Sequence, residues 1–65
     1  MTDERRLREI IKIAAAAVVL PALARRATGA EFTPNHVVGV AFEYGHVFAE
    51  AISDEVIADL LKAAE

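Results

Sequence analysis

The first residues whose types and spacing could do chemistry are Glu43 and His46, a Glu-x-x-His pair, with Glu50 one helical turn further on. On a bundle helix such a pair is part of the ligand set of di-iron carboxylate proteins. That ligand set also needs carboxylates from facing helices, and an antiparallel partner would present residues 16–19, which are alanine and valine. The simpler interpretation is a solvated polar strip, in which His46 and Glu50 interact weakly at i, i+4. We therefore predict no metal site and no cofactor.

A second candidate is the connection between two expected helices. Arg25 and Arg26 precede it, and Asn35 and His36 follow it at a helix N-terminus. Free backbone N–H groups at such a terminus favour anions, and arginines can add bidentate contacts to a phosphate. These four residues are our candidate site for a small anionic ligand such as a nucleotide, although ordinary helix capping also explains each of them.

The chain offers few side chains that could act in nucleophilic catalysis. The only serine is Ser53, which is placed to cap a helix, and no glycine-rich phosphate loop is present. Tyr44 lies on an apolar helix face and is expected to pack there. We therefore predict that the protein is not an enzyme.

The element that must position most of these residues is a helix over 34–52. Thr33 is a good N-cap, Pro34 suits the first helical position, and Phe32 and Val37 have the spacing of a hydrophobic staple. The apolar arc of this helix is about twice the width of 100° that one packing partner requires. The helix should therefore be covered from at least two directions.

A row of small residues runs along the same helix at four-residue spacing: Ala41, Gly45 and Ala49. Such a row lets another helix backbone come close. Each glycine inside a helix costs about 1 kcal/mol relative to alanine, and close packing could offset that cost.

Two further helices are expected, over residues 3–28 and 54–64, with Thr2 and Ser53 as their caps. The first is apolar all round from 13 to 24, so we expect it to be buried on every side. Pro21 should kink it, although a split into two helices is the alternative. A short turn after Gly29 favours an antiparallel pair. The third helix either follows a bend at 52–53 or continues the second helix without a break.

Composition bounds the class of protein. The chain has 65 residues, of which 55% are apolar, and no cysteine. A core this small has no disulfide to stabilise it, and one chain would expose much of its apolar surface. We therefore expect the chain to associate with other copies, which would bury that surface. A net charge of −3 argues against a nucleic-acid binder. The uncharged run 13–24 is too short to span a bilayer, and no signal-peptide pattern is evident. We expect a cytoplasmic protein.

These patterns together predict an all-α fold: one domain, 1–65, with an antiparallel helical hairpin and a short C-terminal helix, assembling into an oligomeric bundle. The helix over 34–52 should lie at the centre of a dimer or higher homo-oligomer. The predicted interface residues are Val19, Leu23, Val38, Ala41, Phe42, Tyr44, Gly45, Phe48 and Ala49.

Residues 14–23 (AAAAVVLPAL), 41–44 (AFEY) and 48–51 (FAEA) carry a resemblance that covers about 13–52. In these stretches the chain resembles small helical proteins encoded by tailed phages and prophages. That resemblance implies no catalytic residue. It implies a phage accessory protein, and some small phage proteins sequester nucleotide signals of host defence at subunit interfaces. We therefore expect a non-enzymatic oligomeric interaction protein, or alternatively an oligomer that sequesters an anionic ligand.

The anion hypothesis predicts a thermal shift. If Arg25 and Arg26 bind phosphate, saturating nucleotide should raise the melting temperature by a few degrees, because a ligand that binds only the folded state stabilises it. Arg25→Ala combined with Arg26→Ala should abolish the shift. A shift that survives this double substitution would place the site elsewhere.

Overall fold

The computed structural model describes residues 2–26 and 33–64, and these residues form three helices and no strand. The helices are α1 (Asp3–Arg26), α2 (Pro34–Ala51) and α3 (Asp54–Ala63). The predicted all-α class is therefore confirmed. The predicted ends at 52 and 64 each lie one residue beyond the observed ends, and residues 27 and 28 of the first predicted helix lie outside the described residues.

The helix starts follow from local hydrogen bonds. The Thr33 hydroxyl accepts from the His36 N–H at 3.2 Å, and Pro34 occupies the first turn of α2. The Ser53 hydroxyl accepts from the Val56 N–H at 3.3 Å at the start of α3. Both predicted caps are confirmed. Because Ser53 has extended backbone angles, it separates α3 from α2. Phe32, half of the predicted staple, lies outside the described residues.

The first helix begins in the same way, since the Thr2 hydroxyl accepts from the Arg5 N–H at 3.2 Å. It then continues through Pro21 without a break, so the alternative of two separate helices is wrong. Proline removes one backbone hydrogen bond from the ladder, and the rest of the ladder carries α1 past it. Pro21 is exposed, and its carbonyl oxygen accepts from the Arg25 side chain at 3.4 Å.

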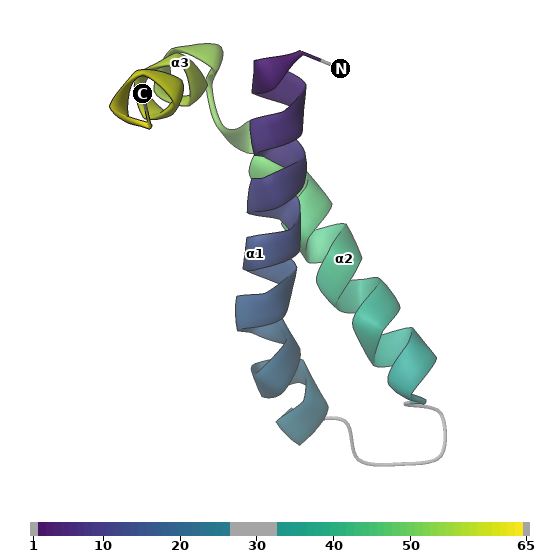
Figure 1. The fold of residues 1–65 in the computed structure, drawn as a ribbon. Coiled ribbons are helices and arrows are strands. Elements are labelled where there is room, and N and C mark those ends of the chain that lie inside the picture. Colours follow the sequence, from purple (N-terminus) through teal and green to yellow (C-terminus); the bar gives the residue numbers. More distant parts are fainter. Residues whose placement is uncertain (1, 27–32, 65) are drawn as a thin grey trace.

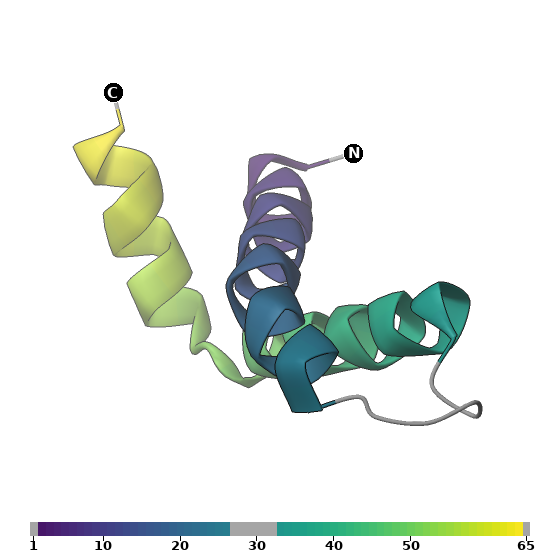
Figure 2. The same cartoon turned by 90° about the horizontal axis from the view of Figure 1, so that it is seen from below.

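Within one subunit the central element is α1, which packs against both α2 and α3. Figures 1 and 2 show α2 and α3 on different sides of α1, with α3 beside the first turns of α1. Contacts between α1 and α2 run in opposite order along the chain: Arg5 meets Glu50, and Lys12 lies against Gly45. The two helices converge near α3 and diverge towards their connection (Figure 1).

The crossing of α1 and α2 is tight at Gly45. A Cβ atom added to Gly45 would overlap the Lys12 carbonyl oxygen and would lie 3.2 Å from the Ala16 backbone nitrogen. Ala41 and Ala49, one turn to either side of Gly45, are each only 2% exposed. The predicted close approach of a helix backbone along this row is confirmed for Gly45, and the backbone that approaches belongs to the same chain.

The core that results is thin. Among the described residues, the buried apolar side chains are Ala16, Val37, Ala41, Ala49 and Ile57. Three of these five are alanines, whose burial removes little apolar area from water. Ile57, on α3, is the one large side chain in the described part of the chain that is completely enclosed. Most of the large apolar side chains of this subunit therefore lie outside its own core.

Two glycine substitutions test the crossing. Gly45→Ala should lower the free energy of unfolding by about 1–3 kcal/mol, because the added methyl group meets rigid backbone atoms of α1. Gly39→Ala is the matched control on the same helix: nothing lies within 4 Å of its added Cβ. That variant should gain up to about 1 kcal/mol from helix propensity. Urea unfolding at one fixed protein concentration measures both, and equal effects of the two substitutions would contradict the tight crossing.

Candidate functional site: apolar grooves beside the helix crossing

One groove beside the crossing, the Tyr44 groove, has a volume of about 340 Å³. It lies between one flank of α1 and the same-side flank of α2. It is lined by Ile11, Ala14, Ala15, Val18, Val19, Tyr44 and Phe48. Its α1 side contributes small and aliphatic side chains, and its α2 side contributes the two aromatic rings.

A second groove, the Phe42 groove, occupies about 170 Å³. Its lining is Ile13, Ala16, Ala17, Leu20, Val38, Ala41 and Phe42. On a helix with 100° per residue, Tyr44 and Phe42 fall on opposite flanks of the row that contains Gly45. The two grooves therefore lie on opposite sides of the helix crossing.

The width of the apolar arc on α2 explains why grooves exist on both sides. The strip in contact with α1 consists of Val37, Ala41, Gly45 and Ala49, all of which are buried. The apolar arc extends beyond this strip on both flanks, and α1 is too narrow to cover the excess. The side chains on the flanks stay exposed: Tyr44 is 52% and Phe42 is 45% accessible to solvent.

The aromatic wall of the Tyr44 groove is internally ordered. The rings of Tyr44 and Phe48 lie one helical turn apart, with centroids 6.4 Å apart and planes 15° from parallel. Such offset pairs are favourable beyond the area they bury. Opposite them, Val18 of α1 is 79% exposed. The groove therefore has two stacked aromatic rings on α2 and a largely exposed apolar side chain, Val18, on α1.

The chemistry of both grooves is that of a surface for apolar contact. Among their lining side chains, the Tyr44 hydroxyl is the one polar group. A single phenol offers no acid–base pair and no set of metal ligands. The surface of both grooves is therefore almost entirely apolar.

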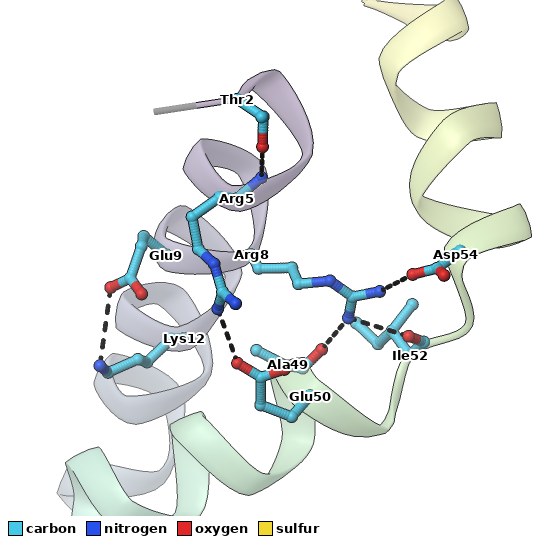
Figure 3. Close-up of polar contacts among 9 residues, drawn as sticks. All are labelled: Thr2, Arg5, Arg8, Glu9, Lys12, Ala49, Glu50, Ile52 and Asp54. Carbon is cyan, nitrogen blue, oxygen red and sulfur yellow. Dashed lines mark hydrogen bonds and ion pairs between the residues drawn. The ribbon is translucent and has the colours of Figure 1, made fainter.

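The described polar side chains gather elsewhere, around Arg8 near the start of α1 (Figure 3). The Arg8 Nη1 atom donates to the Ala49 carbonyl oxygen at 2.6 Å and to the Ile52 carbonyl oxygen at 2.9 Å. Its Nη2 atom donates to Asp54 Oδ1 at 2.8 Å. The Arg8 side chain is 10% exposed, so its charge is largely removed from bulk water. Arg8 therefore joins α1 to the end of α2 and to the start of α3.

This cluster connects the three helices. A cavity of about 190 Å³ beside it is lined by Thr2, Glu4, Arg5, Arg8 and Asp54, whose formal charges cancel. Arg5 also pairs with Glu50 at 2.9 Å. The sequence prediction missed the role of Arg8, because nothing in the mixed-charge segment 3–12 distinguishes it from its neighbours. Because its acceptors at residues 49 and 52 are backbone carbonyl groups, which every residue has, the side chains at those positions do not indicate that an arginine binds there.

The predicted anion residues lie at the diverging ends of α1 and α2. Arg25 and Arg26 end α1, Asn35 and His36 lie in the first turn of α2, and all four are exposed. The connection between them, including Thr28 and Gly29, is outside the described residues. None of these four side chains lines the grooves or the cavity described above.

The polar strip on α2 is also exposed. Within residues 2–26 and 33–64, no three histidine or acidic side chains approach closely enough to hold a metal ion. Glu50 has Arg5 as its partner rather than His46. Glu43 and His46 lie on the face of α2 that points away from the row at Gly45.

The structure divides the predicted interface residues into two groups. Ala41, Gly45 and Ala49 are buried against α1 of the same chain, because only small side chains fit that crossing. Val38, Phe42, Tyr44 and Phe48 flank the crossing and are exposed, whereas Val19 and Leu23 on α1 are half-buried. The first group thus packs inside the subunit, and the second remains open to contact with a partner.

In the described part of the chain, none of the helices has both the length and the hydropathy to span a lipid bilayer. No known family model, curated protein or solved structure matches this chain.

Replacing Arg8 tests its role in holding the helices together. Arg8→Met, which keeps an apolar stem, should lower the free energy of unfolding by about 2–3 kcal/mol, because hydrogen bonds from a charged group to partly buried carbonyls are lost. Arg5→Met is the matched control, because its ion pair with Glu50 is half-exposed. It should cost less than about 1 kcal/mol. Urea unfolding of both variants at one concentration measures the difference, and similar losses would argue against a special role for Arg8.

Proposed function

We propose that this protein is a non-enzymatic, self-associating helical interaction protein that uses the apolar surfaces beside the crossing of α1 and α2. The observation that carries the proposal is the exposure of large apolar side chains along both flanks of the crossing. Besides Val18, Phe42 and Tyr44, the half-exposed set includes Ile13, Val47 and Phe48. Contiguous apolar surface of this kind is typical of a site that binds another protein surface.

The small core supports the same proposal. The row of small residues at the crossing fixes the distance between α1 and α2, but it contributes little buried apolar area. Chains of this length rarely reach useful stability from one core without a further source of stabilisation, and this chain has no cysteine for a disulfide. Contact with further copies would supply further burial, and the assembly would then be more stable than the separate chain.

The lining of the grooves supports a binding role rather than a catalytic one. The side chains there are alanine, aliphatic and aromatic, and the described charged residues lie at the Arg8 cluster, at helix ends or on the outer faces of the helices. The resemblance of residues 13–52 to small phage proteins supports an accessory role. A surface of this composition recognises the shape and apolarity of its partner.

Self-association predicts a mass above that of one chain. Sedimentation velocity and light scattering of the purified protein should give at least twice the 7.0 kDa of the monomer. The melting temperature should also rise with protein concentration up to about 100 µM, because assembly is coupled to folding by mass action. A folded monomer whose melting temperature does not change over this range would overturn the proposal.

A further inference from the structure

The surface area of the chain indicates how much of it a partner would cover. The accessible surface is 4994 Å², whereas a compact monomer of 7.0 kDa exposes about 4,000 Å². The excess of roughly 1,000 Å² is close to the ~800 Å² that each partner contributes to a standard protein interface. The radius of gyration, 14.2 Å against about 11 Å for a compact domain of this length, reflects the same extended shape. One interface with a second copy accounts for the excess.

The Tyr44 groove is the larger of the two grooves, about 340 Å³ against about 170 Å³. The exposed large apolar residues that line it are Val18, Tyr44 and Phe48, of which Val18 is 79% exposed. Those that line the Phe42 groove are Ile13, Val38 and Phe42, which are 39–57% exposed. The larger surface is therefore the one that a first partner would cover.

The Tyr44 groove also lies on an apolar face of α1 whose first turns are partly covered by the rest of the chain. Leu7, Ile11, Ala14 and Val18 share one face at helical spacing. Leu7 and Ile11 are half-buried, and Figure 1 shows α3 lying beside the first turns of α1. Val18, further along the same face, is 79% exposed. Beyond α3, this apolar face has no cover within the described part of the chain.

The Tyr44 groove is suited to contact its own copy. Its lining combines the small side chains of Ala14 and Ala15 with the larger side chains of Val18, Tyr44 and Phe48, which are about half or more exposed, so that a two-fold axis through the groove would bring Val18 of one copy against Val18 of the other. None of its lining residues carries a charge, so pairing the groove with itself opposes no like charges there. A chain with a net charge of −3 would repel its own copy elsewhere on its surface, which makes this uncharged region the favourable one.

We propose that a second copy of this chain docks in the Tyr44 groove isologously, with the Tyr44 groove of one subunit facing the Tyr44 groove of the other. This inference rests on the proposed self-association and names its partner and its geometry. Val18 lies near the two-fold axis, where the two Val18 side chains meet, and the stacked Tyr44 and Phe48 rings become buried. The Phe42 groove stays outside this interface.

Opposite charges introduced at one position test the two-fold relation. Val18→Lys and Val18→Glu should each weaken dimerisation at least about 100-fold, because two like charges would then be buried at one apolar contact. An equimolar mixture of the two variants should recover dimers that contain one of each, since the charges then attract. Native mass spectrometry with one variant isotopically labelled counts these mixed dimers.

Ile13→Lys is the matched control, because Ile13 is an exposed β-branched residue on the same helix that lines the Phe42 groove. It should leave the dimer in place. Circular dichroism spectra confirm that each variant keeps its helices, as expected for positions that are 79% and 57% exposed.

The outcomes separate this inference from the proposed function. An oligomeric wild type in which Val18→Lys has no effect, in which the mixture fails to recover dimers, or in which Ile13→Lys dissociates the dimer would overturn the isologous Tyr44 interface alone. A monomeric wild type would overturn both proposals. Loss of the dimer in both single Val18 variants, followed by recovery in the mixture, would establish the two-fold contact.

Discussion

The contact of Gly45 with the backbone of α1 at Lys12 and Ala16 is the constraint on which the rest of the subunit depends. It sets how closely α1 and α2 cross, and small residues occupy the neighbouring contact positions, Ala41 and Ala49. Alanine and glycine make a close crossing but bury little apolar area, so the crossing defines the geometry of the subunit more than it stabilises it. The hydrophobic stabilisation has to come from the side chains outside the strip.

The exposed aromatic residues follow from that constraint. A close crossing of two helices leaves a recess on each side, and the side chains that border the recess cannot reach across it. Tyr44, Phe48 and Phe42 occupy these borders and remain about half exposed. The same row of small residues that joins the helices thus produces the grooves, and the grooves are the surfaces on which the proposed assembly relies. The close crossing and the exposed apolar flanks therefore have one cause.

Local signals in the sequence were sufficient for the helices. Thr33 with Pro34, and Ser53 with the acidic residues that follow it, mark helix starts through hydrogen bonds made within one turn, and such signals depend on nothing distant. The row at Gly45 also predicted a close helix backbone, but the sequence could not specify whether that backbone belonged to the same chain or to a second copy.

The role of Arg8 was beyond sequence reasoning. Its acceptors at Ala49 and Ile52 are carbonyl groups, which every residue has, and they lie more than forty positions away. The candidate site was predicted in part. The excess width of the apolar arc on α2 indicated exposed side chains, but their division into a buried strip and two flanking grooves depends on the angle at which α1 and α2 cross. Binding of an anion by Arg25, Arg26, Asn35 and His36 remains a prediction.

The Arg8 contacts have a consequence for how the chain comes together during synthesis. Arg8 is synthesised more than forty residues before its acceptors at Ala49, Ile52 and Asp54. Until then the Arg8 guanidinium group stays hydrated, and α1 can pack against neither α2 nor α3. The first turns of α1 can therefore dock only after residues 49–54 have been made, and until then the apolar middle of α1 is exposed without the Arg8 contacts that join the three helices.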